Sequence, residues 1–155
     1  MHECCCATDS LRALRPIGGV KFELTEISGR AIAAAEQWQS GYYDWTEVLR
    51  RFNDPDRLDV ALWDVERLLA LGVATTRSNA VWIELVEGDR DRSAPLTGAR
   101  LLILFDTFAN YAQLRGKREI RWEAKNAGLA ALYENTYGFE RVLSKGNALY
   151  WARRV

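Results

Sequence analysis

The sequence of 155 residues contains no cysteine or histidine after its first six positions. Its three cysteines are Cys4, Cys5 and Cys6, and its single histidine is His2. A disulfide framework and any catalytic dyad that needs a histidine in the core are therefore excluded. The cluster is either a soft-metal or redox site or a disordered terminus with reactive thiols. We favour the second, because adjacent cysteines do not easily surround one tetrahedral ion, and so we expect no bound metal.

The sequence also has no net charge and no long hydrophobic run. Its 21 Lys and Arg residues balance 21 Asp and Glu residues, so it has no broad field to attract nucleic acid or an anionic membrane. We interpret the basic run at residues 115–121 as a helix C-terminus and a solvated strand face. No apolar stretch approaches the length of a membrane span, and the N-terminus does not resemble a signal peptide. We expect a soluble cytoplasmic protein with no membrane or nucleic-acid partner.

The length suits a single domain that buries its own core without support from metals or disulfides. We expect an irregular arm over residues 1–19 and one domain over residues 20–155, because Gly18-Gly19 marks a turn between them. Ser28 and Asp44 are placed to cap helices that follow them. The chain therefore predicts one compact unit with a short N-terminal extension.

Hydrophobic periodicity predicts the order of the elements, since period two indicates strands and period 3.6 indicates helices. The predicted strands are residues 20–27, 58–63, 68–75, 80–86, 119–124, 140–143 and 148–155. The predicted helices are residues 29–39, 44–52, a long helix from Gly98 to residue 115, and residues 128–135. Gly72 is predicted to mark a bulge. In the third central strand we expect Val81, Ile83 and Leu85 on one face, with Trp82, Glu84 and Val86 on the other.

Residues 97–139 carry a family resemblance. Gly98 precedes a long helix that ends Tyr-Ala-Gln-Leu-Arg-Gly at 111–116, and a strand and then Asn126, Tyr133 and Gly138-Phe139 follow. This order resembles the C-terminal half of the GNAT (Gcn5-related N-acetyltransferase) superfamily, and residues 58–72 resemble its central hairpin. The resemblance implies a single α/β (α+β) domain with a mixed central sheet of about seven strands and helices on both faces. It also implies acyl transfer from acyl-CoA to an amine.

The resemblance implies that the start of the long helix binds the CoA pyrophosphate, because backbone N–H groups and the helix dipole favour an anion there. The family's usual loop is Gln/Arg-x-x-Gly-x-Gly/Ala, and this chain has Pro-Leu-Thr-Gly-Ala-Arg at 95–100. The candidate cofactor-binding residues are Thr97, Gly98, Ala99, Arg100 and Asn126. Asn126 either contacts the pantetheine arm or caps the last helix.

The loop departs from the family's pattern at two positions. Pro95 replaces the leading polar residue, and Arg100 stands where a second small residue is expected. Either Arg100, with Arg90 and Arg92, supplies charge-assisted phosphate contacts, or the pocket no longer binds CoA. We favour binding of acetyl-CoA or another acyl-CoA, because Gly98 and the long helix are present together.

Two residues are candidates for proton transfer. Tyr133 matches the family's Asn-x6-Tyr spacing, and its phenol could return a proton to the departing thiolate. Four residues instead of the usual three separate Tyr133 from Gly138-Phe139, so Tyr137 is the fallback candidate for the general acid. The alternative interpretation is that these tyrosines are core residues. Glu84 is the candidate general base, and Asp106 and Glu123 are weaker candidates. Glu84 could equally be a paired strand charge.

The candidate substrate contacts, again by resemblance, are Tyr42, Tyr43 and Trp45. Trp45 also fits a core position, because it begins an apolar helical face. An aromatic wall with little charge would suit a flat or apolar acceptor better than a polyamine.

We predict an acyl-CoA-dependent N-acyltransferase, most simply an acetyltransferase, that acts on a small-molecule or protein amine. Homodimers are common for this fold. One alternative is a GNAT-fold binding or regulatory protein that has lost acyl transfer, which the altered loop at 95–100 favours. Another is a fold relative that modifies a nucleobase, for which we expect a base-sized pocket with a basic rim.

Overall fold

The computed structural model describes residues 21–38, 41–123, 127–143 and 149–155. The predicted N-terminal arm, the cysteine cluster with His2, and Asn126 lie outside the described residues, so the predictions for them stay predictions.

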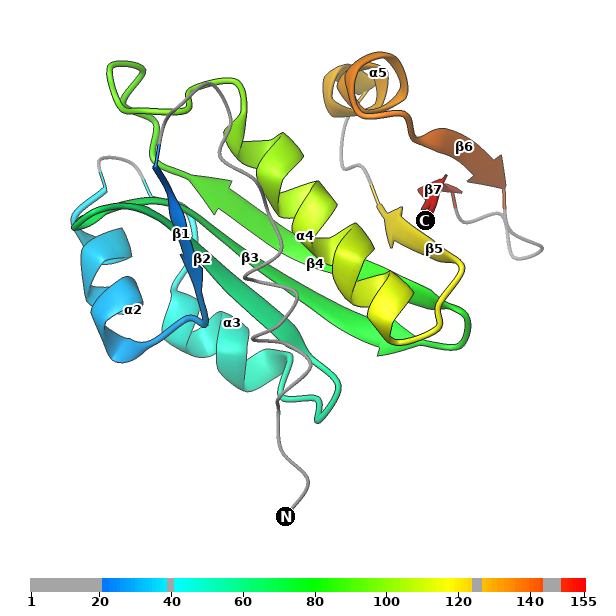
Figure 1. Cartoon of the computed structure of the whole chain (residues 1–155), viewed down its shortest axis with the longest axis horizontal. Helices are drawn as coiled ribbons and strands as arrows, with labels where there is room; N and C mark the ends of the chain where they lie inside the picture. The colour runs from blue at the N-terminus through cyan, green and yellow to red at the C-terminus, as the bar shows by residue number, and fades with distance from the viewer. Residues whose placement is uncertain (1–20, 39–40, 124–126, 144–148) are drawn as a thin grey trace.

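Seven strands form one mixed sheet in the order β1-β2-β3-β4-β5-β7-β6 (Figure 1). The strands are β1 (Glu23–Thr25), β2 (Leu58–Asp64), β3 (Arg67–Arg77), β4 (Ala80–Gly88), β5 (Glu119–Trp122), β6 (Glu140–Leu143) and β7 (Leu149–Arg154). Only β4 and β5 run parallel, and every other neighbouring pair is antiparallel. The predicted mixed sheet of about seven strands is confirmed.

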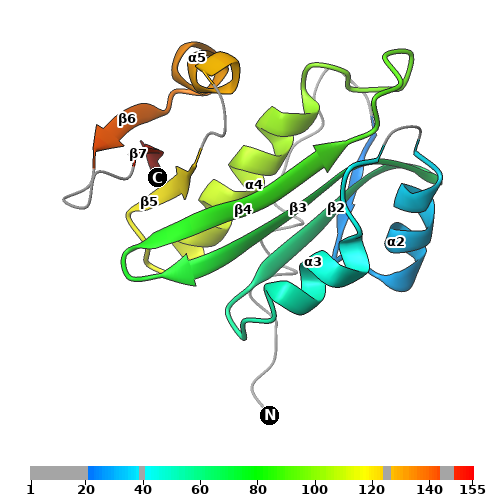
Figure 2. The same ribbon diagram turned by 180° about the vertical axis from the view of Figure 1, so that it is seen from behind.

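The described residues form four helices, which are α2 (Gly29–Glu36), α3 (Trp45–Arg51), α4 (Arg100–Leu114) and α5 (Ala127–Thr136). α4 lies on one face of the sheet, and α2 and α3 lie on the other (Figures 1 and 2). The predicted caps are confirmed, because Ser28 accepts a hydrogen bond from the Ala31 N–H and Asp44 accepts from Thr46 and Glu47. Because α4 lies opposite α2 and α3, the predicted helices on both faces of the sheet are confirmed as well.

Two hydrophobic cores follow from this layering. The core under α4 includes Ile103, Phe105 and Phe108, and the core under α2 and α3 includes Trp45 and Val48. The ring of Phe105 packs edge-on against Trp122, Tyr133, Tyr137 and Phe139, with centroids 4.9 to 5.9 Å apart. Edge-to-face contacts of this kind are a preferred arrangement of aromatic pairs. They join α4, β5 and α5 around one end of the sheet.

The prediction of a bulge at Gly72 is wrong. Gly72 pairs in register with Val60 and Val86. A glycine is needed there because a Cβ would lie 2.9 Å from Cζ of Phe108. The close approach of a ring from α4, and not a local break in pairing, is the reason for this glycine.

A bulge does occur in β4, at Glu84. Val73 pairs with Leu85 while Ala74 pairs with Ile83, so Glu84 has no partner on β3. The extra residue reverses the alternation of side chains beyond it. Leu85 packs in the core under α2 and α3, and Val86 packs against the core under α4. The predicted faces of these two side chains are therefore exchanged.

The start of the long helix also differs from its prediction. α4 begins at Arg100, with Ala99 at the N-cap, and not at Gly98. Leu96 and Gly98 have positive φ angles of 59° and 89°, which no residue of a right-handed helix adopts. The loop therefore continues two residues further than the sequence pattern indicates.

Candidate active site

A cavity of about 380 Å³ opens where the two parallel strands stop pairing. β4 and β5 pair from Ala80 and Glu119 to Ile83 and Trp122; β5 ends there, whereas β4 continues to Gly88. Residues of β4, of the start of α4 and of α5 line the cavity. Six of the main predicted site residues are brought together here: Tyr43, Glu84, Thr97, Gly98, Arg100 and Tyr133. The fallback Tyr137 and the weaker candidate Glu123 also line the cavity.

Tyr133 lies in the cavity wall, with 2% of its surface exposed. Its hydroxyl makes no hydrogen bond within the described parts of the chain. Burial raises the pKa of Tyr133 well above its usual value, and the neighbouring Tyr137 raises it further. Burial also raises the pKa of Tyr137, which lines the same cavity. Both phenols therefore stay protonated at neutral pH, and each hydroxyl can act as a hydrogen-bond donor.

Glu84 occupies the bulge of β4 and lines the cavity. One of its carboxylate oxygens, Oε1, accepts a hydrogen bond of 2.6 Å from Thr75 Oγ1 and one of 2.7 Å from Arg77 Nη2. Glu84 lies one residue beyond the last pair of β4 with β5. The other oxygen, Oε2, has no partner among the described residues. The carboxylate is thus held at the point where the strands diverge, and it is also the paired strand charge of the alternative interpretation.

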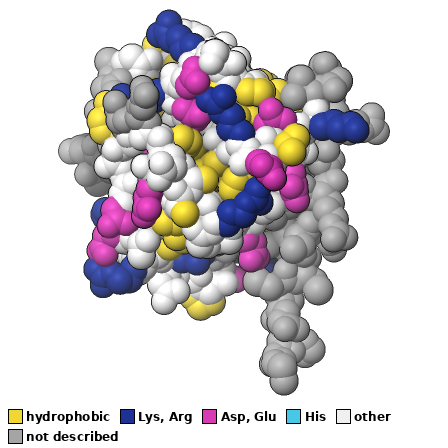
Figure 3. Space-filling model, turned by 90° about the vertical axis from the view of Figure 1, so that its left-hand side faces the viewer, with side chains coloured by type: hydrophobic (Ala, Val, Ile, Leu, Met, Phe, Trp, Pro, Cys, Tyr) yellow, Lys and Arg dark blue, Asp and Glu magenta, His cyan; other side chains and the backbone are white. Residues whose placement is uncertain are grey.

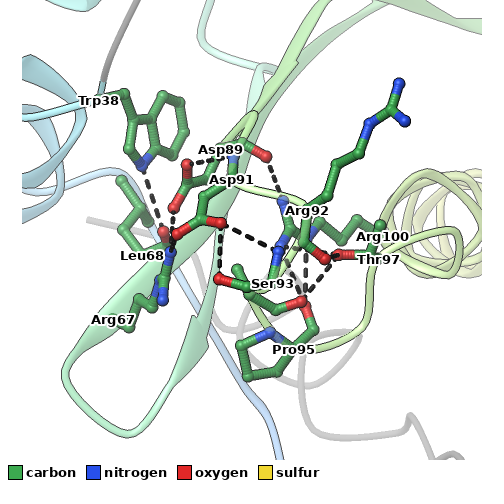
Figure 4. Close-up of polar contacts among 11 residues, drawn as sticks. Trp38, Arg67, Leu68, Asp89, Asp91, Arg92, Ser93, Pro95, Thr97 and Arg100 are labelled. Atoms are coloured by element: carbon green, nitrogen blue, oxygen red, sulfur yellow. Dashed lines mark hydrogen bonds and ion pairs between the residues drawn. The ribbon is translucent and has the colours of Figure 1, made fainter.

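The loop between β4 and α4 is held by polar contacts (Figure 4). Arg67 of β3 forms ion pairs of 3.0 Å with Asp89 and 2.9 Å with Asp91. Asp91 also accepts hydrogen bonds from the backbone N–H and the hydroxyl of Ser93. The bonds from Ser93 and Arg67 lower the pKa of Asp91 to about 2. The side chain of Arg92 points away from this network (Figure 4).

Arg100 lies inside this loop with its guanidinium buried. The guanidinium donates to the carbonyl oxygens of Pro95 and Asp89, and Nη2 lies 3.4 Å from the hydroxyl of Thr97. Burial lowers the pKa of Arg100 from its usual value. The side chain therefore ties the end of β4 to the start of α4, and its donors are engaged by the loop before any phosphate binds.

The first turn of α4 has no side-chain cap and no acidic residue. The first N–H groups of a helix have no partner within the helix, so they are donors for an anion. Gly98 comes just before this turn and lines the cavity. A Cβ at Gly98 would meet no atom within 4 Å, so its backbone is open to a ligand.

The three predicted substrate contacts have different positions. Tyr43 is 39% exposed and lines the cavity, and Tyr42 is 70% exposed with Arg90 stacked 3.9 Å from its ring centroid. Trp45 is 2% exposed and packs in the core under α2 and α3. Trp45 is therefore a core residue, as its alternative interpretation has it.

Glu87 of β4 is a cavity residue that the sequence analysis missed. Its carboxylate accepts hydrogen bonds from the Tyr42 N–H, at 2.8 Å, and from Trp45 Nε1, at 2.9 Å. The expected wall with little charge therefore contains a carboxylate. No local signal indicates Glu87, because its partners lie more than forty positions earlier in the chain.

The two weaker candidates for the base are in different places. Asp106 lies on α4 and pairs with Arg153 of β7 at 3.1 Å, and it does not line the cavity. Glu123 follows β5, lines the cavity and is exposed.

The surface shows no predominance of one charge on the side that Figure 3 presents. Positive and negative side chains alternate there around a hydrophobic area, in agreement with the zero net charge of the sequence. Among the described residues, no helix is both long enough and apolar enough to span a membrane.

No protein-family model matches the sequence, and no curated protein matches it. Several solved structures are similar in fold. The ribosomal-protein-S18-alanine N-acetyltransferase of Escherichia coli is 16% identical with a TM-score of 0.60, and the match covers 87% of this chain and 94% of that one. A GNAT-family acetyltransferase of Staphylococcus aureus is 10% identical with a TM-score of 0.62, over 86% and 99% of the two chains.

A third similar structure holds coenzyme A. It is the PaiA N-acetyltransferase of Thermoplasma acidophilum, which is 15% identical with a TM-score of 0.56, over 87% of this chain and 99% of that one. At these identities the likeness concerns the fold. From the order of its strands to the placement of its helices, the chain has the fold of the GNAT acetyltransferases.

Proposed function

We propose that the protein is an acyl-CoA-dependent N-acyltransferase, most simply an acetyltransferase that uses acetyl-CoA. The observation that carries this proposal is the place of the cavity, which opens where β4 and β5 stop pairing, beside the start of α4 and under Tyr133. A thioester is already activated, so the protein has to position two partners and transfer two protons. The GNAT fold supports the same activity.

The residues at the cavity fit an acyl-CoA. The uncapped N-terminus of α4 and the open backbone at Gly98 suit the pyrophosphate. Leu101 and Leu129 line the cavity and supply apolar surface for the pantetheine arm. When bound, CoA supplies the thioester and the thiolate leaving group.

In this proposal each side chain has one role. Tyr133 donates a proton toward the departing sulfur, because its phenol is protonated and has no partner among the described residues. Glu84 accepts a proton from the ammonium acceptor, directly or through water. Thr97, Gly98 and Ala99 hold the pyrophosphate, and Arg100 keeps their loop in place from inside.

One observation favours a second candidate function, a GNAT-fold binding or regulatory protein without acyl transfer. The donors of Arg100 are turned to the carbonyl oxygens of Pro95 and Asp89. The guanidinium is therefore engaged by the loop itself and does not supply the charge-assisted phosphate contacts that would compensate for the altered loop.

Calorimetric titration with acetyl-CoA and with CoA decides between the two candidates. We expect micromolar binding that Gly98→Glu abolishes, because a carboxylate beside the helix N-terminus repels the pyrophosphate. Gly29→Glu is the matched control, since Gly29 opens α2 away from the cavity and a Cβ there meets nothing within 4 Å. Absence of binding at millimolar ligand would favour the regulatory candidate.

A further inference from the structure

We propose that Glu87 selects the acceptor: the acyl group goes to a cationic amine that carries no carboxylate, and Glu87 holds an ammonium group of this amine beside Tyr43. The reacting nitrogen still loses a proton to Glu84 before it attacks the thioester. This inference rests on the proposed acyl transfer, and it names the substrate class of the same cavity.

The carboxylate of Glu87 lines the cavity wall and has only neutral donors among the described residues. Its Oε2 accepts a bond of 2.8 Å from the Tyr42 N–H, and its Oε1 accepts a bond of 2.9 Å from Trp45 Nε1. Both donors are neutral, and none of the ion pairs among the described residues includes Glu87. Each carboxylate oxygen has a second lone pair, so Glu87 can still accept hydrogen bonds from an ammonium group.

The other acids that line the cavity differ from Glu87. Glu84 is paired with Arg77 at 2.7 Å, and Asp89 is paired with Arg67 at 3.0 Å. Glu123 follows β5 and is exposed, whereas Glu87 is half-buried, and none of the ion pairs of the described residues includes Glu123.

The two arginines near the cavity, Arg90 and Arg100, form no ion pair with Glu87. Arg100 donates to carbonyl oxygens at the α4 end, and Arg90 stacks on Tyr42 without lining the cavity. The acceptor end therefore has an excess of negative charge, which attracts an ammonium group and repels a carboxylate.

A second observation points to a ligand in this space. The side chain of Tyr133 is only 2% exposed, and its hydroxyl has no hydrogen-bond partner among the described residues. Because every fully buried side-chain oxygen and nitrogen of the described residues has a partner, this hydroxyl is not fully enclosed, and Tyr133 is a lining residue of the cavity. Tyr43 adds an aromatic face at the rim, and such a face attracts a cation.

Two matched pairs of amines test the inference in an acetyl-CoA turnover assay. Phenethylamine and phenylalanine differ only in a carboxylate, and putrescine and 4-aminobutyrate differ in whether the far end is an ammonium or a carboxylate. We expect kcat/KM at least about tenfold higher for the cationic member of each pair, which corresponds to one charge-assisted contact.

Glu87→Gln separates the charge from the structural role of Glu87. We expect it to lower kcat/KM for the cationic amines about tenfold, mainly through KM, and to leave the dissociation constant of CoA unchanged. Trp45→Phe is the control, because it removes the bond to Oε1 and keeps the charge, and we expect it to change the selectivity less than threefold.

Equal use of both members of each pair would overturn the inference, and so would equal selectivity losses in Glu87→Gln and Trp45→Phe. Either outcome would leave acyl transfer standing. Calorimetry measures the binding of the same amines without the reaction. Failure of both cationic amines to bind at millimolar concentration would also overturn the inference. Failure to bind acetyl-CoA, in contrast, removes the proposed function itself.

Discussion

The ring centroids of Trp122 and Tyr133 lie 5.0 Å apart. Trp122 is the last residue of β5 that pairs with β4, and Tyr133 lies on α5. The contact therefore places α5 over the point where the parallel strands diverge, and it brings the phenol of Tyr133 to the cavity. Aromatic packing therefore positions the side chain of the candidate acid, whose hydroxyl has no hydrogen-bond partner among the described residues.

Tyr133→Phe should lower kcat about 100-fold, as expected for the loss of a general acid. The affinity for acetyl-CoA should not change, and the free energy of unfolding should change by less than about 0.5 kcal/mol, because no hydrogen bond is lost. Steady-state kinetics and calorimetry measure the two effects. Tyr137→Phe is the control, and a larger loss of kcat in that variant would transfer the acid role to Tyr137.

The raised pKa values of the two cavity tyrosines predict how stability depends on alkaline pH. Burial favours the neutral phenols, so the folded state holds these protons to higher pH than the unfolded state does. Their contribution to stability is complete below the unfolded pKa of about 10 and is lost as pH rises above it. The melting temperature should fall above pH 10, and less steeply in Tyr133→Phe. An unchanged slope in that variant would contradict the assignment.

Gly98→Ala should destabilise the protein by roughly 1–2 kcal/mol, because Gly98 has φ = 89° and an L-residue is strained there. No atom lies within 4 Å of the new Cβ, so a clash contributes nothing. Urea unfolding measures the cost. Gly29→Ala, which has the same open space without a positive φ, should be neutral or stabilising. Equal effects of the two changes would refute the strain argument.

Gly72→Ala should cost about 1–3 kcal/mol through overpacking, because its Cβ would lie 2.9 Å from Phe108 Cζ and 3.3 Å from Val86 Cγ1. Gly88→Ala is the control, since its nearest neighbour would lie 3.6 Å away. In the double variant Gly72→Ala/Phe108→Leu, the total loss should be smaller than the sum of the single losses. Strict additivity would show that the ring of Phe108 is not the obstacle.

Asp91→Asn should increase amide hydrogen exchange in the loop that follows β4 and weaken CoA binding. The low pKa of Asp91 means that its bonds to Ser93 and Arg67 persist above about pH 4 and are lost as pH falls toward 2. Wild-type exchange in the loop should therefore approach that of the variant at low pH. Asp54→Asn is the control, because Asp54 accepts a similar hydrogen bond from the Asp56 N–H in a turn far from this loop in the sequence. Slow exchange in Asp91→Asn would contradict this role.

The sequence by itself determined the elements and their order. Alternation and helical periodicity depend on which residues need burial, and the caps at Ser28 and Asp44 depend on side chains within three residues of the N–H groups that they accept from. The seven strands and four helices of the described residues, and their order, were therefore predictable from the chain. The placement of helices on both faces of the sheet was predicted from the family resemblance.

Only the tertiary structure decided the details of the cavity. The bulge at Glu84 depends on how β3 and β4 align, and this alignment depends on cores formed by distant residues. Arg100 turns into its loop because the carbonyl of Asp89, eleven positions away, lies within reach. Glu87 meets Tyr42 across 45 positions. Such contacts come from packing between elements, and periodicity along the chain does not encode them.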